Sequence, residues 1–247
     1  MSEIAWLLKN KLTFSPRLKR KAQLVSIDHL LRSFTSGQIT RHGFLSEQYD
    51  LSNWPSVCTK TEYIENLYLL DVLNRYLPSI PENGKGLDIG CRNFCHLPAL
   101  SAFHSYAWMG VEIDCHARYW NGYTRKAYGE YMASQFPRAS YRGGSLLETT
   151  GQFRMISWFL PFLFPETQSA WGLPTRYFDP KRMLAKALEL LATNGVMLIV
   201  NQGQHEAEEQ LRLLEDAGIE YKNLGCIESI FSPFIKPRYG WLVSGGV

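Results

Sequence analysis

Two short apolar runs, each ending in acidic residues, constrain the fold of this chain more than any other feature. The first lies in Gly86-Leu-Asp-Ile-Gly-Cys-Arg-Asn-Phe94, and the second in Gly110-Val-Glu-Ile-Asp114. Glu112 follows Gly90 by 22 residues, close to the spacing of about 20 in one strand–helix–strand unit. A turn at Gly90 lets the backbone approach a ligand, and an acid after the second strand can accept hydrogen bonds from ribose hydroxyls. The pair predicts a nucleoside-binding half-site.

Predicted strands and helices alternate along most of the chain. Asp179-Pro180 supplies a helix N-cap followed by proline, and Asn194-Gly195 supplies a helix end. The alternation predicts an α/β fold, with a doubly wound, mostly parallel sheet and helices on both faces. The expected strands are 86–89, 107–113, 139–143, 153–159 and 196–200, with closing extended runs near 224–231 and 240–243, and the expected helices are 98–103, 115–134, 180–194 and 206–217.

Residues 1–79 are predicted to form an N-terminal helical extension, and residues 80–247 the nucleoside-binding domain. Apolar positions between residues 18 and 34 fit one helical face. Thr59-x-x-Glu62 is a capping box, and it predicts a helix that Pro78 ends.

The basic residues gather in the N-terminal extension. Residues 1–45 carry eight Lys or Arg against two acids, a balance of +6, whereas the whole chain has a net charge of +3. The cluster Arg17-x-Lys-Arg-Lys21 is open to two interpretations, a contact with RNA phosphates or a solvated helix face. The second is more common for one short basic block, which favours a small-molecule substrate over RNA.

Composition favours a cytoplasmic protein with no membrane-spanning segment. A hydrophobic share of 45% in 247 residues is enough for a full core, and no apolar run approaches the roughly 20 residues of a membrane span. The N-terminal residues lack the basic leader of a secretory signal. The five cysteines are odd in number and lack the spacing of a disulfide framework, so reduced thiols are expected.

The order of the motifs resembles that of class I S-adenosylmethionine-dependent methyltransferases, with an atypical first motif. The resemblance covers about residues 80–245. It implies a Rossmann-like fold with a seven-stranded sheet whose last strand is antiparallel. It also implies S-adenosyl-L-methionine as cofactor and S-adenosyl-L-homocysteine as product. The matching segments are 87–93, 110–112, 143–147, 156–162 and 190–199.

By position, the resemblance also implies a set of cofactor-binding residues. Asp88 and the loop after it would lie beside the methionine part, and Glu112 would bind the ribose hydroxyls. Ser145 stands where an acid commonly contacts adenine. Asn93 is expected to allow a tight turn, because asparagine tolerates the left-handed conformation. The full predicted set is Asp88, Gly90, Cys91, Arg92, Asn93, Glu112, Ile113, Ser145, Leu146 and Trp158.

Three positions depart from the family pattern. Arg92 and Phe94 replace loop glycines, and Ser145 replaces the third-motif acid. The missing glycines argue against a nicotinamide oxidoreductase, whose pyrophosphate site needs G-x-G-x-x-G. Two hypotheses stay open. One is an active methyltransferase whose extension covers the pocket or forms a homodimer contact. The other is a catalytically silent methyltransferase-like binding or scaffold protein.

The methyl acceptor is expected beyond the carboxyl ends of the later strands. Leu160-Pro161-Phe162 resembles the proline-aromatic loop with which amino-group methyltransferases grip a planar acceptor, although Phe159 replaces the Asn or Asp that opens that loop. Leu160, Pro161 and Phe162 are therefore the predicted substrate-binding residues.

Histidine and cysteine residues suggest further chemistry in three places. His205 follows the strand at 196–200 and is the candidate general base, with a solvated histidine at a helix start as the alternative. Cys91-x-x-x-Cys95-His96 and Cys115-His116 lack the paired C-x2-C spacing that is typical of structural zinc sites. Small packed thiols are the favoured interpretation, so no metal is predicted.

Overall fold

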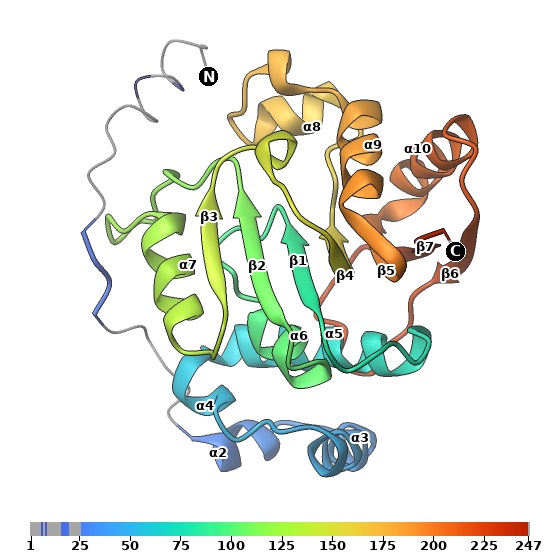
Figure 1. Cartoon of the computed structure of the whole chain (residues 1–247). Coiled ribbons are helices and arrows are strands. Elements are labelled where there is room, and N and C mark those ends of the chain that lie inside the picture. Colours follow the sequence, from blue (N-terminus) through green and yellow to red (C-terminus); the bar gives the residue numbers. More distant parts are fainter. Residues whose placement is uncertain (1–5, 7, 9–15, 20–25, 247) are drawn as a thin grey trace.

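The structure is a computed structural model of the chain, and it describes residues 6, 8, 16–19 and 26–246. A seven-stranded sheet lies at its centre in the order β3-β2-β1-β4-β5-β7-β6 (Figure 1). The first five strands of this order run parallel, and β7 is antiparallel to both of its neighbours. The predicted sheet is confirmed. The strands are β1 (Lys85–Ile89), β2 (Ala107–Glu112), β3 (Ser140–Gly143), β4 (Phe153–Phe159), β5 (Leu191–Gln202), β6 (Tyr221–Cys226) and β7 (Arg238–Ser244).

Helices cover both faces of the sheet. Successive residues of β5 alternate between two core clusters, because neighbouring side chains of a strand point to opposite faces. Side chains of α5 and α6 belong to one cluster, and those of α9 and α10 belong to the other. The helices are α2 (Ile27–Leu31), α3 (Ser36–Gln48), α4 (Trp54–Val57), α5 (Lys60–Tyr76), α6 (Leu97–Phe103), α7 (Arg125–Ser134), α8 (Pro165–Ala170), α9 (Pro180–Leu190) and α10 (Gly203–Asp216), with short 3-10 turns η1 (Leu146–Glu148) and η2 (Thr175–Tyr177).

The two capping signals seen in the sequence open the expected helices. The Thr59 hydroxyl accepts from the backbone N–H of Glu62, and the Glu62 carboxylate accepts from the backbone N–H of Thr59, which completes the capping box of α5. Asp179 accepts from the backbone N–H of Arg182 at the start of α9. These caps fix where both helices begin.

The predicted helix 115–134 is wrong in its first half, since α7 begins at Arg125. The chain reverses before it: Arg118 and Thr124 form an isolated bridge, and Gly122 takes a left-handed φ of +82°. The Thr124 side chain then caps α7 by accepting from the backbone N–H of Ala127. Aromatic residues in this segment fit a helical pattern, but the turn at Gly122 prevails.

Other boundaries also differ from the expectation. Helix α9 ends at Leu190 rather than near Asn194, because Leu191 already pairs with Phe153 in the sheet. Helix α10 begins at Gly203, three residues early, and β6 ends at Cys226. Of the helix expected over residues 18–34, the structure forms only α2, and residues 20–25 lie outside the described residues.

Helices α2–α5 share one core with the sheet. Leu30, Leu45 and Trp54 are almost fully buried in the same cluster as Trp108 and Met155 of the strands. Polar groups join the same elements, because the buried Asp71 carboxylate of α5 binds side chains of α3, α5 itself and the segment after β6. Its partners are Arg41 Nε at 2.7 Å, Arg75 Nε at 2.9 Å and Ser229 Oγ at 2.6 Å.

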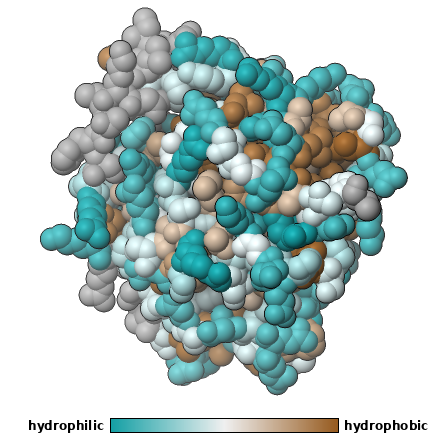
Figure 2. Space-filling view, in the orientation of Figure 1, coloured by the Kyte–Doolittle hydropathy of each residue, from teal (hydrophilic) through white to brown (hydrophobic). Residues whose placement is uncertain are grey.

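Figure 2 shows that hydrophilic residues cover much of the visible face and surround smaller apolar areas. Within the described part of the chain, none of the helices has the length and apolar character needed to cross a lipid bilayer.

Candidate functional site

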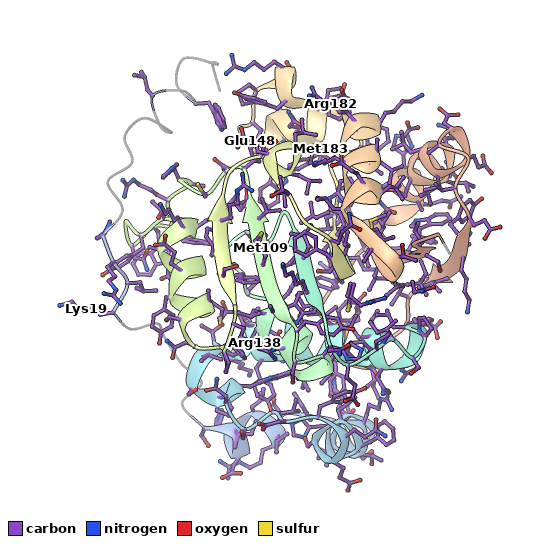
Figure 3. All side chains as sticks on the ribbon, in the orientation of Figure 1. Lys19, Met109, Arg138, Glu148, Arg182 and Met183 are labelled. Carbon is purple, nitrogen blue, oxygen red and sulfur yellow. The ribbon has the colours of Figure 1, made fainter. Side chains whose placement is uncertain are left out.

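A cavity of about 760 Å³ opens at the carboxyl ends of the parallel strands. Residues that end β1, β2, β4 and β5 line it, together with η1 and the segment from α8 to the start of α9. Figure 3 shows Glu148, Arg182 and Met183 at this end of the sheet, with Arg138 at the other end. Ligands of open parallel sheets bind at this edge, and the volume suits a small organic ligand.

The cavity brings together almost all of the residues predicted from the sequence. Asn93 does not line it, and neither does His205, whose exposed ring stacks on Phe164 with 4.3 Å between ring centroids. Glu206, next to His205, does line the cavity. The predicted residues that line it are Asp88, Gly90, Cys91, Arg92, Glu112, Ile113, Ser145, Leu146, Trp158, Leu160, Pro161 and Phe162.

The loop after β1 has left-handed φ values at three positions, although only the first of them is a glycine. Gly90, Arg92 and Phe94 have φ values of +67°, +54° and +60°. Asn93 has no positive φ, so Arg92 and Phe94, and not Asn93, supply the left-handed residues after Gly90. The Phe94 ring is fully buried against Gly110, where an added Cβ would lie 2.9 Å from the ring. This packing stabilises a turn that side chains ordinarily disfavour.

Two substitutions in this loop are expected to change stability in opposite directions. Gly90→Ala should lower the free energy of unfolding by about 1 kcal/mol, because the alanine must adopt a left-handed φ, although its Cβ meets no atom of the described residues within 4 Å. Arg92→Gly should raise it by about 0.5 kcal/mol, since relief of the same strain exceeds the added flexibility of the unfolded chain. Urea denaturation of both variants measures these changes. A loss in Arg92→Gly as large as that in Gly90→Ala would contradict the account.

Glu112 lies at the centre of a buried polar network. Its carboxylate is 5% exposed and accepts from the backbone N–H groups of Arg92 at 2.9 Å and Asp114 at 2.7 Å. Arg125 lies 3.5 Å from Glu112 and 3.3 Å from Asp114. Burial raises the pKa of Glu112, and the Arg125 charge opposes that shift. Each carboxylate oxygen can accept a further hydrogen bond, so the group can still bind two hydroxyls.

Asp88 lines the cavity and has a buried acceptor that is unused among the described residues. The residue is 1% exposed; Oδ1 accepts from Ser157 Oγ at 2.8 Å, whereas the buried Oδ2 has no hydrogen-bond partner among the residues that the structure describes. Burial raises the pKa of Asp88 to about 7, the hydrogen bond from Ser157 opposes the shift, and the charge of Glu112 adds to it. A buried acceptor without a partner calls for an explanation, and a donor on a bound ligand supplies one.

Several cavity residues carried no recognisable sequence motif. Trp171 and Tyr177 come from the segment between β4 and α9, and Arg125 comes from α7, with its guanidinium 5.5 Å from the Trp171 ring. Trp6 packs on Tyr177 with 4.9 Å between ring centroids, so the N-terminal extension reaches the cavity rim. The one signal in the sequence was the group of aromatic residues between the predicted strand 153–159 and the predicted helix 180–194.

Ser145 has a local structural role. Its side chain accepts from the backbone N–H of Leu147 at 3.2 Å and caps the 3-10 turn η1. The backbone before it turns sharply, with a φ of +146° at Gly144. Ser145 therefore stabilises the loop after β3. The contact with adenine that the resemblance implies at this position stays a prediction.

Solved structures share this fold, although no family model and no curated protein matches the sequence. A protein of Methanococcus maripaludis assigned as an S-adenosyl-L-methionine-dependent methyltransferase aligns with a TM-score of 0.54 at 12% identity, over 75% of this chain and 86% of that chain. A methyltransferase from Pyrococcus furiosus has a TM-score of 0.51 at 12% identity, over 74% and 83%. The CurJ carbon methyltransferase has a TM-score of 0.50 at 10% identity, over 78% and 56%. The chain has the Rossmann-like fold of class I S-adenosylmethionine-dependent methyltransferases.

Proposed function

We propose that this protein is a methyltransferase that uses S-adenosyl-L-methionine to methylate a small molecule. The observation that carries the proposal is the unpartnered Oδ2 of Asp88, a buried acceptor at the carboxyl end of β1. The cofactor has an ammonium group, which is a donor of the kind this oxygen lacks. Glu112, at the end of the neighbouring strand, has acceptor capacity left for the two ribose hydroxyls.

The order of the strands supports one orientation of the cofactor. Glu112 ends β2, and the Ser145 turn follows β3, so the ribose and adenine would lie toward that side of the sheet. Asp88 and Trp158 end β1 and β4, so the methionine part would lie there. The reacting methyl group would then face Phe159 and the segment after it.

The proposed chemistry needs alignment more than covalent help. When bound, the cofactor supplies a methyl group on a positively charged sulfur. The chain would hold the acceptor in line with that group and exclude water from it. Phe162, Trp171 and Tyr177 provide an aromatic wall for a small acceptor. An enclosed cavity of this size favours a small molecule over RNA, and an RNA contact of the basic segment and a homodimer remain predictions.

Calorimetry of the full chain with S-adenosyl-L-methionine and with S-adenosyl-L-homocysteine tests the cofactor. We expect both to bind with one molecule per chain. Binding of neither compound would refute the proposal. Methyl transfer is tested separately, by the formation of S-adenosyl-L-homocysteine with a panel of phenols, thiols, amines and carboxylic acids. Cofactor binding without transfer to any of them favours the silent binding protein.

A further inference from the structure

One wall of the cavity carries a cluster of potential metal ligands that the proposed cofactor does not use. One ligand atom each from Glu65, Cys95 and His96 lies within 4.8 Å of the other two. Cys95 is buried and the other two residues are half-buried, and Cys95 and His96 line the cavity. Glu65 comes from α5, 30 residues before Cys95, so no local spacing in the sequence indicates the cluster.

The cluster is held by a fully buried amide. Asn66 Nδ2 donates to the carbonyl oxygens of Glu62 and Cys95, both at 2.8 Å, and its Oδ1 accepts from the backbone N–H of Ala99 at 2.9 Å. These bonds join α5 to the turn that carries Cys95 and His96. The backbone segments that carry the two parts of the cluster are therefore held together before any ligand binds.

The positive charge of Arg92 acts on both Cys95 and His96. The nearby Arg92 opposes a bound cation electrostatically. Arg92 is exposed, so water screens part of this repulsion.

We propose that Glu65, Cys95 and His96 form a zinc site with an open coordination position toward the cavity. Oxygen, sulfur and nitrogen donors in a set of three match catalytic zinc sites, which keep one position for water or substrate. Bonds of about 2.0–2.3 Å in a tetrahedron put ligand atoms about 3.5 Å apart. The three ligand atoms, which lie within 4.8 Å of one another, must therefore approach by at most about 1.3 Å.

The site lies where an acceptor is expected, and this role rests on the proposed function. The His96 ring is 5.1 Å from that of Phe159 at the carboxyl end of β4, whereas Glu112 ends β2 on the other side of β1. An acceptor thiol or alcohol bound to the ion would release its proton to solvent. Its lone pair would then attack the methyl carbon as the carbon–sulfur bond breaks, and the bonding electrons would stay on the cofactor sulfur.

Metal binding can be tested without cofactor or acceptor. The full chain is stripped with a chelator, loaded with Zn²⁺ or Co²⁺, dialysed and measured by elemental analysis and absorption. We expect one ion per chain and a near-ultraviolet sulfur-to-cobalt charge-transfer band. Cys95→Ser should remove the band, while Cys115→Ser, which changes a buried cysteine outside the cluster that also precedes a histidine, should retain it.

Two further variants keep the test decisive. Circular dichroism checks the folding of each variant. If Cys95→Ser fails to fold, His96→Gln takes its place in the test, and we expect it to weaken Zn²⁺ binding at least tenfold. Arg92→Ala should tighten Zn²⁺ binding about fivefold by removing a nearby positive charge. Absence of bound metal in the folded wild-type chain, or a band that persists in Cys95→Ser, would overturn the site. Calorimetry of the stripped protein with S-adenosyl-L-methionine shows separately whether the proposed cofactor binds.

Discussion

Replacing Glu112 with alanine is expected to weaken the binding of S-adenosyl-L-methionine and S-adenosyl-L-homocysteine by about 100-fold or more. A hydrogen bond to a charged group contributes about 1.5–3 kcal/mol, and the carboxylate is expected to accept two from the ribose hydroxyls. The substitution also removes the acceptor for the backbone N–H groups of Arg92 and Asp114, which shapes the loop after β1. Calorimetry of wild type and variant measures the loss.

Two further variants separate ligand binding from folding. Glu112→Gln keeps an acceptor oxygen and should weaken binding by about tenfold, as expected when one charge-assisted hydrogen bond is lost. Glu130→Ala removes an exposed carboxylate of α7 that pairs only weakly with Lys126 at 3.7 Å, and it should leave the affinity unchanged. Thermal unfolding confirms that each variant is folded. An affinity in folded Glu112→Ala equal to that of wild type would contradict the ribose assignment.

The protein is expected to lose stability as the pH rises from about 4 to about 7, because of Asp88. Its pKa is raised to about 7 in the folded chain, against about 4 in an unfolded chain. Between these values the folded state binds a proton that the unfolded state has released, so each pH unit lowers the free energy of unfolding by about 1.4 kcal/mol. The stabilising contribution of the Asp88 proton to the free energy of unfolding is therefore complete below about pH 4 and lost above about pH 7.

Asp88→Asn should remove this pH dependence. Asparagine can keep an oxygen acceptor for Ser157, but it has no proton to lose in this range. Relative to wild type, the variant should gain about 3 kcal/mol of stability between pH 5 and pH 8, as the linkage relation requires. Urea denaturation at several pH values measures the difference. Asp216→Asn, an exposed carboxylate change, serves as the control and should leave this slope in place. Equal slopes in wild type and Asp88→Asn would contradict the assignment.

The sheet was predictable because its signals are local. The predicted strand 153–159 coincides with β4, and the caps at Thr59 and Asp179 begin their helices as expected. The failure at 115–124 has a physical cause: its apolar and aromatic residues fit a helix, but a glycine-containing reversal ends in a bridge between Arg118 and Thr124. Apolar periodicity indicates which face a residue would occupy if a helix formed. It does not indicate whether the segment forms a helix or a chain reversal.

The site was predictable where topology alone determines it. Asp88 and Glu112 lie at the carboxyl ends of adjacent parallel strands, so they had to meet at one edge of the sheet. Arg125 reaches the cavity wall from α7, and Glu65 of α5 approaches Cys95 and His96, which line that wall. Helix packing depends on contacts far apart in the sequence. The same limit applies to histidine: His205 lies just after a strand but outside the cavity, whereas His96 turns into it. Their positions in the sequence did not indicate which of the two histidines would line the cavity.

The shared core of α2–α5 and the sheet has a practical consequence for protein engineering. The sequence-based prediction divides the chain at residue 79, yet Trp54 before it and Trp108 after it lie in one apolar cluster. A truncated chain that began at residue 80 would expose the face of the sheet that packs against α2–α5, and the exposed apolar surface would promote aggregation. Deletions and inserted fusion partners are therefore better confined to exposed surface turns, such as the one that contains the fully exposed Trp120.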